Sequence, residues 1–200
     1  IYTLSLHDAL PILVILPPVT AKQQETQGTI RLRPLLENEI ARKLVSVEDF
    51  QDRSTVTILG DGLFESGSAQ IQDQYYPVLA RVSQALDSVE GQIVVTGYTD
   101  DKPIQSLNFP SNWHLSQARA DAVKEILLNY IKNGGTRIRS EGRGSTDPVA
   151  PNNTLENRAK NRRVEITLFT TGTGPKLGRA VEVKTNTSTT QPNSDVNTHQ

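Results

Sequence analysis

Apolar residues alternate between two spacings along residues 29–170 of this 200-residue chain. A spacing of two is typical of strands, and a spacing of three or four is typical of amphipathic helices. Strands are predicted over 55–59, 92–99, 136–142 and 163–169. Helices are predicted over 32–44, 73–89 and 112–132, with a short one after Asn153. This alternation predicts the α/β class, as an α+β sandwich in which one sheet packs against helices.

Local signals mark the ends and faces of these helices. Asp73 is predicted to cap the second helix, and Asn153, followed by Glu156 three residues later, resembles a capping arrangement for the last one. The Gly134–Gly135 pair is predicted to end the third helix. The apolar face of that third helix is predicted to consist of Leu115, Ala118, Ala122 and Ile126.

Composition divides the chain into four segments. The folded unit is predicted over about 29–170. Within it, 29–54 is predicted to be a helical lead-in and linker, and 55–170 the domain proper. Residues 171–200 are rich in Thr, Asn, Gly and Ser, which predicts a disordered tail. Residues 1–28 are interpreted as either a disordered start or the truncated end of a membrane-proximal segment.

The first residues contain the one strongly apolar run of the sequence. It covers 9–19, has 11 residues and includes three prolines, whereas a spanning helix needs about 20 apolar residues. Residues 1–11 resemble translated sequencing-adaptor sequence, so we leave them out of the functional argument.

The cysteine and histidine counts exclude several kinds of site. The chain has no Cys, which excludes disulfides, thiolate metal sites and a cysteine nucleophile. It has three His, too few to favour a multi-histidine metal site. We therefore expect neither a metal nor a cofactor.

Charge is distributed unevenly, although the formal net charge is −1. Residues 61–101 contain seven acidic residues and one basic residue, whereas 137–163 contain seven basic and three acidic residues. This split favours a ligand that carries both signs of charge, such as a zwitterion. Nucleic acid is not an expected partner, because aromatic residues make up 5% of the chain and do not interleave with the basic cluster.

One constellation points to such a ligand. Asp100 follows an apolar strand, where side chains leave the core and can meet a ligand. Asn112, Ser116 and Arg119 share one face near the start of the next helix, where unpaired backbone N–H groups favour an anion. Arg119 can hold a carboxylate through two parallel hydrogen bonds, and Asp100 can hold an ammonium group. Together they form a two-ended clamp for an amino acid that has both a free amine and a free carboxylate.

Four segments carry a family resemblance: TGYTD, FPSNWHLSQARADAV, EGRG and NRAKNRRVEI. Over residues 55–169 they resemble, in order, the OmpA-like peptidoglycan-binding domains that also occur in Pal and MotB. The resemblance implies a βαβαβαβ-type fold with one mixed sheet, and non-covalent binding of diaminopimelate in the peptidoglycan stem peptide. It implies that Asp100 and Arg119 contact the ligand. The surrounding pocket positions that it implies are Thr99, Asn112, Leu115, Ser116, Asn161 and Arg162.

The segment RLRPLLENEIARKLVSVED, just before this region, is similar to the TssL branch of the family, the inner-membrane components of type VI secretion systems. This similarity implies the periplasmic part of an inner-membrane protein whose membrane helix lies upstream. It implies peptidoglycan and the subunits of the secretion membrane complex as partners, with a homo-oligomer as a further option.

Other functions receive less support from the sequence. A hydrolase would use Ser116 with His114 and Asp100, but two residues two positions apart on a helix point in different directions. Asp100 and Asp101 as paired carboxylates for sugar cleavage would diverge at a strand exit. The EGRGS segment lacks the Gly-Lys-Ser/Thr ending of a phosphate loop. The main alternative is a structural module that docks partner proteins or oligomerises without affinity for the cell wall.

Overall fold

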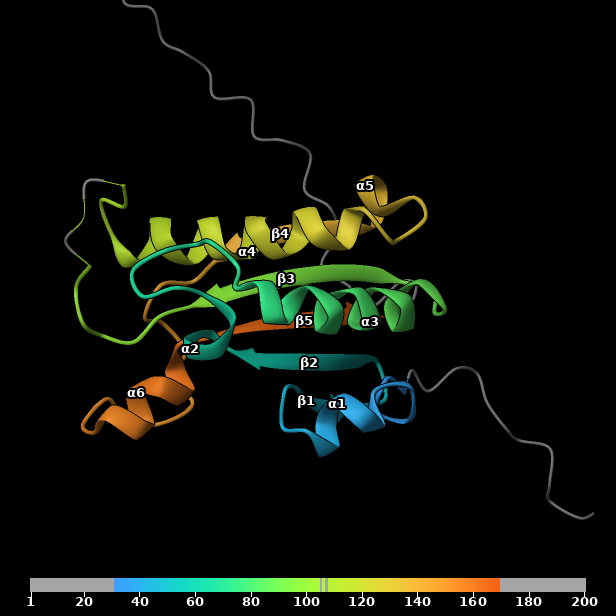
Figure 1. Ribbon diagram of the computed structural model, residues 1–200, viewed down its shortest axis with the longest axis horizontal. Coiled ribbons are helices and arrows are strands. Elements are labelled where there is room, and N and C mark those ends of the chain that lie inside the picture. Colours follow the sequence, from blue (N-terminus) through green and yellow to red (C-terminus); the bar gives the residue numbers. More distant parts are fainter. Residues whose placement is uncertain (1–30, 105, 107, 170–200) are drawn as a thin grey trace, which may run out of the picture.

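The computed structural model describes residues 31–104, 106 and 108–169, and in this part of the chain five strands form one sheet (Figure 1). The strands are β1 (Ser46–Asp49), β2 (Arg53–Leu59), β3 (Gln92–Tyr98), β4 (Ile138–Gly142) and β5 (Arg163–Phe169). The helices are η1 (Arg33–Leu35), α1 (Glu37–Ala41), α2 (Gly60–Leu63), η2 (Asp73–Tyr75), α3 (Tyr76–Asp87), α4 (Asn112–Leu128), α5 (Gly134–Arg137) and α6 (Leu155–Asn161), of which η1 and η2 are 3-10 helices.

The sheet is mixed, as the family resemblance implies. Its strand order is β1-β2-β5-β3-β4. β5 pairs antiparallel with β2 on one side and with β3 on the other, β1 pairs antiparallel with β2, and β3 pairs parallel with β4. The last strand in the sequence therefore lies at the centre of the sheet.

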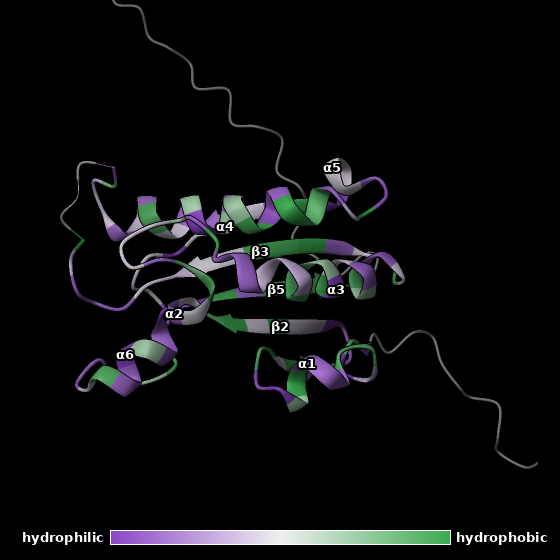
Figure 2. Cartoon of the chain, viewed as in Figure 1, coloured by the Kyte–Doolittle hydropathy of each residue, from purple (hydrophilic) through white to green (hydrophobic). Residues whose placement is uncertain are grey.

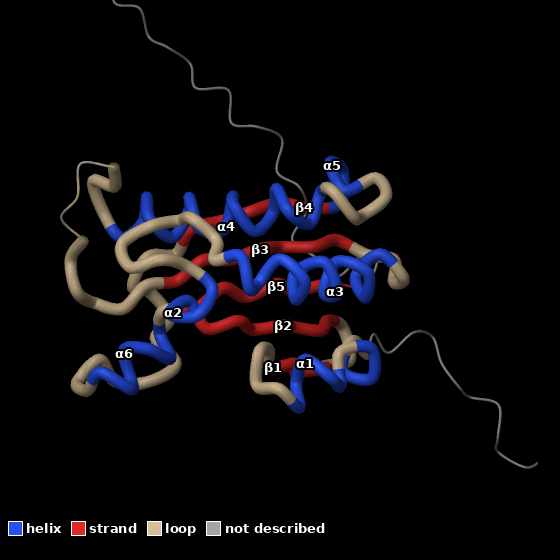
Figure 3. The backbone as a smooth tube through the Cα atoms, viewed as in Figure 1, coloured by secondary structure: helices blue, strands red, loops and turns tan. Residues whose placement is uncertain are grey.

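The helices α3 and α4 cover one face of the sheet (Figure 3). Both helices show hydrophobic and hydrophilic residues in turn along their length (Figure 2), as expected for helices with one buried side. Between these helices and the sheet lies a core whose strand residues include Val56, Ile58, Ile93, Val95, Val164, Ile166 and Leu168.

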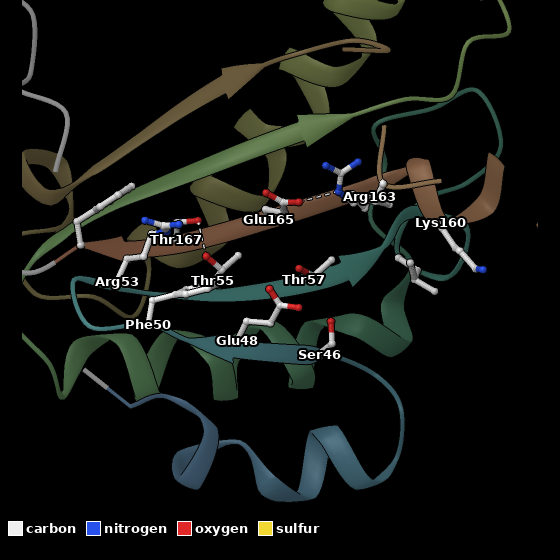
Figure 4. Close-up of a pocket in the computed structure, with 13 residues that line it drawn as sticks. Ser46, Glu48, Phe50, Arg53, Thr55, Thr57, Lys160, Arg163, Glu165 and Thr167 are labelled. Carbon is white, nitrogen blue, oxygen red and sulfur yellow. Dashed lines mark hydrogen bonds and ion pairs between the residues drawn. The ribbon is translucent and has the colours of Figure 1, made fainter. Parts of the chain in front are cut away.

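The opposite face of the sheet is polar. Figure 4 shows side chains of β1, β2 and β5 that line an open depression of about 630 Å³ on this side. The strand residues there alternate with the buried ones, and include Thr55, Thr57, Glu165 and Thr167. β2 and β5 are therefore amphipathic, with one face in the core and one face toward solvent, whereas β3 is buried on both faces.

Three of the four predicted strands are confirmed nearly residue for residue, as β2, β3 and β5. β4 begins at Ile138 and not at 136, because the Gly134–Arg137 segment forms the helical turn α5. For the same reason the two glycines do not end α4, which ends earlier, at Leu128.

Both predicted caps are displaced. Asp73 begins the 3-10 turn η2 and caps nothing with its side chain, since neither η2 nor α3 has a side-chain cap. The N-cap of α6 is Thr154, one residue after the predicted Asn153, and its hydroxyl accepts a hydrogen bond from the Asn157 N–H at 3.1 Å.

The buried side of α4 also differs from the prediction. Leu115 and Ile126 are buried as predicted, but Ala118 and Ala122 are only partly buried. Ser116 and Arg119 are buried in addition. Two polar residues thus lie on the buried side of α4, where the apolar pattern predicts only apolar residues, and both lie toward the start of the helix.

The segment predicted as a lead-in and linker belongs to the domain. Leu32 and Leu36 are fully buried in the core, and β1, which the sequence analysis missed, extends the sheet beside β2. The Asp49 carboxylate accepts hydrogen bonds from the Leu32 N–H at 3.1 Å and from the Ser54 hydroxyl. The packed unit therefore already includes residues from Leu32 onward, within the folded unit of about 29–170 that the sequence analysis expects.

Two predictions fall outside the described residues, namely those for segments 1–28 and 171–200. Among the residues that the structure describes, no helix has both the length and the apolar character needed to span a membrane.

Candidate ligand-binding site

The order of the strands brings distant charged residues together. Leu59 of β2 and Tyr98 of β3 are both register partners of Arg163, the first residue of β5. The chain just before β5 therefore lies between the segments that follow β2 and β3. Arg162 occupies this position, Asp61 follows β2 within α2, and Asp100 follows β3. Figure 1 shows α2 and α6 at this same end of the sheet.

Arg162 bridges the two aspartates. Its Nε and Nη2 atoms donate to the two carboxylate oxygens of Asp61, both at 2.5 Å, and its Nη1 atom donates to Asp100 Oδ2 at 2.5 Å. The hydrogen bond with Asp61, followed by that with Asp100, raises the pKa of Arg162 above its ordinary value. Asp100 is 8% exposed, and its other oxygen accepts the Lys102 N–H at 3.1 Å.

Arg119 reaches the same region from the buried side of α4. It is 6% exposed, its Nε donates to the Ser68 carbonyl oxygen at 2.8 Å, and its guanidinium lies 4.9 Å from the centre of the Phe64 ring. Burial lowers the pKa of Arg119 to about 10, and the nearby Asp61 and Asp100 carboxylates oppose that shift. The side chain is therefore a cation at neutral pH.

The terminal nitrogens of this guanidinium are available to a ligand. Within the described residues, Arg119 makes its one side-chain hydrogen bond through Nε, and Nη1 and Nη2 make none. A buried cation with two unused donor nitrogens is well placed for a carboxylate, which accepts such a pair in parallel.

These residues line one cavity of about 390 Å³, which we call the charged basin. Its lining consists of Gly60, Asp61, Phe64, Glu65, Ser66, Gly67, Asp100, Arg119 and Arg162. The convergence of Asp100 and Arg119, on which the sequence-based clamp depends, is present. The basin contains three carboxylates and two guanidinium groups, so it offers both signs of charge to a ligand.

Thr99 and Asn112 lie beside the basin but do not line it. The Thr99 hydroxyl donates to the Asp100 carbonyl oxygen at 2.9 Å. Asn112 Nδ2 donates to the carbonyl oxygens of Asp100 and Lys102 at 3.2 and 2.9 Å, and its Oδ1 accepts the Ile104 N–H at 3.0 Å. Both residues therefore fix the backbone around Asp100.

Ser116, Leu115 and Asn161 are buried and also absent from the lining. The Ser116 hydroxyl donates to the Trp113 carbonyl oxygen at 2.8 Å and accepts the Gly144 N–H at 2.9 Å. Asn161 Oδ1 accepts the N–H groups of Val149 and Ala150, at 2.9 and 3.0 Å. Five of the eight predicted residues are thus absent from the lining, and the four polar ones among them hold backbone segments in place.

The sequence analysis missed the other wall of the basin. Asp61, Phe64 and Glu65 lie just after β2, as Asp100 lies just after β3. The strand-exit signal that points to Asp100 also applies to Asp61. Asp61 lies near Arg162 and Asp100 only because β5 is placed between β2 and β3, and the sequence pattern does not predict that placement.

The hydrolase alternative does not fit these positions. Ser116 is fully buried and hydrogen-bonded within the chain, and the His114 ring nitrogen Nδ1 pairs with the Ser111 hydroxyl at 2.8 Å.

In the part of the chain that the structure describes, no group of three His, Cys, Asp or Glu residues is placed to hold a metal ion.

Comparisons with known proteins agree with the fold. A family model described as the OmpA family matches residues 63–162. A solved structure, the cell wall anchor of the T6SS from Pseudomonas aeruginosa, is 49% identical and has a TM-score of 0.66; the match covers 71% of this chain and 99% of that one. It supports the prediction of a mixed sheet packed against helices.

Two curated relatives are more distant. Motility protein B of Helicobacter pylori is 32% identical over 80% of this chain, and the peptidoglycan-binding protein ArfA of Mycobacterium bovis is 35% identical over 59%. The chain spans 65% and 35% of the lengths of these two proteins. All three similar proteins are named for anchoring, motility or binding and none for catalysis, in agreement with the prediction of a non-enzymatic module.

Proposed function

The chain belongs to the OmpA family, and on that premise we propose that the charged basin binds peptidoglycan without covalent chemistry. The ligand group is the diaminopimelate of the stem peptide, whose far end carries a free ammonium and a free carboxylate. The observation that carries the proposal is the buried Arg119, whose two unused terminal nitrogens share one cavity with the Asp100 carboxylate.

Each charged end of the ligand has a matching partner. The carboxylate accepts two parallel hydrogen bonds from Arg119, and burial strengthens such charge-assisted bonds. The ammonium donates to Asp100, whose two observed hydrogen bonds leave part of its capacity for about four unused. Because a zwitterion satisfies both partners at once, the basin prefers it to a simple anion or cation.

The description of one similar protein supports a proposal for the biological role. The Pseudomonas aeruginosa relative is described as the cell wall anchor of the T6SS. We propose that this chain likewise lies in the periplasm and ties a type VI secretion complex of the inner membrane to the cell wall. Copies of the domain in one assembly would bind neighbouring stem peptides together, so that each single contact need be only modestly tight.

Titration with a diaminopimelate-containing muropeptide tests the basin directly. Calorimetry should show binding to the unaltered protein, and Asp100→Asn and Arg119→Lys should each weaken it by about 10- to 100-fold, as expected for the loss of about 1.5–3 kcal/mol from a bond to a charged group. Glu48→Gln, on the polar face of the sheet and away from the basin, is the matched control. Equal affinity in all four proteins would reject the clamp. Dimerisation without any response to the muropeptide would favour the docking module.

A further inference from the structure

We propose that Asp61 sets the selectivity of the charged basin for a zwitterion over a plain dicarboxylate, by holding Arg162 away from full engagement with Asp100. This inference rests on the proposed function. It concerns a residue whose two carboxylate oxygens both accept hydrogen bonds from Arg162 and which acts through that arginine, so Asp61 is a positioning residue.

Arg162 divides its hydrogen bonds unequally between Asp61 and Asp100. Two of its three nitrogens, Nε and Nη2, point at Asp61 in a parallel pair, and only Nη1 points at Asp100. A parallel pair is the strongest arrangement that a guanidinium forms with a carboxylate. Asp61 therefore fixes the plane of Arg162 and neutralises its charge.

The consequence falls on Asp100. With one bond from Arg162 and one from the Lys102 N–H, its carboxylate keeps acceptor capacity and negative charge for an incoming ammonium. Arg119, with both terminal nitrogens unused, remains the cation of the basin that a carboxylate can reach. The two ends of the clamp thus stay separate because Asp61 occupies the second arginine.

Removal of the Asp61 charge alters this division. In Asp61→Asn the parallel pair is lost, and the guanidinium of Arg162 turns its fork toward Asp100, the other carboxylate that it already contacts. That carboxylate then loses both charge and free acceptor positions. The basin is left with Arg119 for anions and little for cations.

Two small ligands of the same length measure the effect. Diaminopimelate and pimelate share the seven-carbon dicarboxylate chain, and only the first carries ammonium groups. We expect the unaltered protein to prefer diaminopimelate, and Asp61→Asn to reduce the ratio of the two affinities by about tenfold, with the loss confined to diaminopimelate, the scale of one charge-assisted hydrogen bond.

Glu65→Gln is the matched control for charge. Glu65 is another exposed carboxylate of the basin lining, and within the described residues its side chain forms no hydrogen bond or ion pair. The Glu65→Gln variant removes the same charge without releasing Arg162. It should therefore lower the ratio of the diaminopimelate and pimelate affinities by much less than Asp61→Asn does. An equal effect of both variants would mean that net charge alone sets selectivity, and would overturn the proposal.

The double variant Asp61→Asn/Arg162→Gln tests the route of the effect. If Asp61 acts through Arg162, removal of the arginine should restore part of the preference that Asp61→Asn loses. A preference unchanged in Asp61→Asn, or equally poor in the double variant, contradicts the role of Arg162.

If the unaltered protein binds diaminopimelate but Asp61→Asn keeps its ratio, only this inference fails. If the unaltered protein binds neither ligand nor the muropeptide, the proposed function fails with it. Melting temperatures of all variants establish that each is folded.

Discussion

Arg119 illustrates how a binding residue can work against stability. Its pKa is lowered mainly by burial, which means that the folded protein holds the cation less readily than water does. At neutral pH the charged guanidinium therefore costs folding free energy. This free-energy cost falls on a residue whose charge lines the charged basin, where a ligand can use it.

Arg119→Met should separate binding from stability. We expect it to abolish muropeptide binding and to raise the free energy of unfolding by about 1 kcal/mol, since an apolar side chain of similar length can replace a buried charge with a gain. Urea unfolding and calorimetry on the same preparation measure the two effects. A variant that loses binding and also unfolds more easily would show that the Ser68 and Phe64 contacts outweigh the burial cost.

Tyr98 gives a prediction in pH. Burial and, second, the Glu165 carboxylate raise the pKa of Tyr98 to about 12, from the ordinary 10.0, while Arg163 and Arg143 act in the opposite direction. Between pH 10 and 12 the unfolded chain therefore loses this proton and the folded protein keeps it, so the free energy of unfolding falls as pH rises. Tyr98→Phe preserves the ring that stacks on Arg163 at 3.7 Å, and should lack this part of the decline. Urea unfolding from pH 9 to 11 compares the two proteins, and parallel declines would contradict the assignment.

Some residues of the site could be predicted from the sequence, and others could not. Asp100 and Arg119 could be identified because a strand exit and a helix face are local patterns. Asp61 could not be paired with Arg162, which lies 101 residues further along the chain, because their contact depends on the place of β5 in the sheet.

At the scale of elements, the packing of α4 on the sheet positions the site. Gly97 and Gly142 are register partners on β3 and β4, and α4 passes directly over them. A Cβ atom at Gly97 would lie 2.1 Å from the Ser116 carbonyl oxygen, and one at Gly142 would lie 2.5 Å from the Gln117 nitrogen. These glycines allow the start of α4, and with it Arg119, to approach the end of β3 and Asp100.

Gly97→Ala should therefore disturb stability and binding together. The added methyl group meets backbone and not a flexible side chain, so α4 must move, which we expect to cost about 1–3 kcal/mol of unfolding free energy and to weaken muropeptide binding. Gly135→Ala is the control, because a Cβ atom there would have nothing within 4 Å. If Gly97→Ala melts and binds like Gly135→Ala, the close approach of helix and sheet does not position the site.

The elements themselves were predictable to different degrees. β2, β3 and β5 have strong apolar alternation, and their bounds agree closely with the predicted ones. β1 was missed because its sequence, SVED, has a single buried residue, Val47, and no apolar repeat. The face of α4 was predicted only in part: Leu115 and Ile126 are buried, but Ser116 and Arg119 are buried for reasons of hydrogen bonding and charge, which a hydrophobic pattern does not register.

At the scale of the whole molecule, the ends of the described chain meet in the sheet. β1 and β2 come from its beginning and β5 from its end, so β5 is held on one side by a strand more than 100 residues earlier. This long-range pairing is what alternation of strand and helix patterns cannot specify, since several strand orders share the same pattern. It also makes the first described residues part of the framework on which the charged basin stands.

Truncation tests that last point. A chain that begins at residue 55 lacks β1 and the first two residues of β2. It also lacks the buried side chains Leu32, Leu36, Val45 and Val47, each of which contributes about 1.5–3 kcal/mol through burial. The sum is a large part of the about 5–15 kcal/mol that stabilises an ordinary domain. We expect this chain to unfold without a cooperative transition or to aggregate through the exposed edge of β2. A chain that begins at residue 31 keeps all of these side chains, and should unfold in one urea transition and bind the muropeptide. If the chain from residue 55 matches it in both measurements, residues 31–54 are a linker after all, and the charged basin depends on the remaining strands alone.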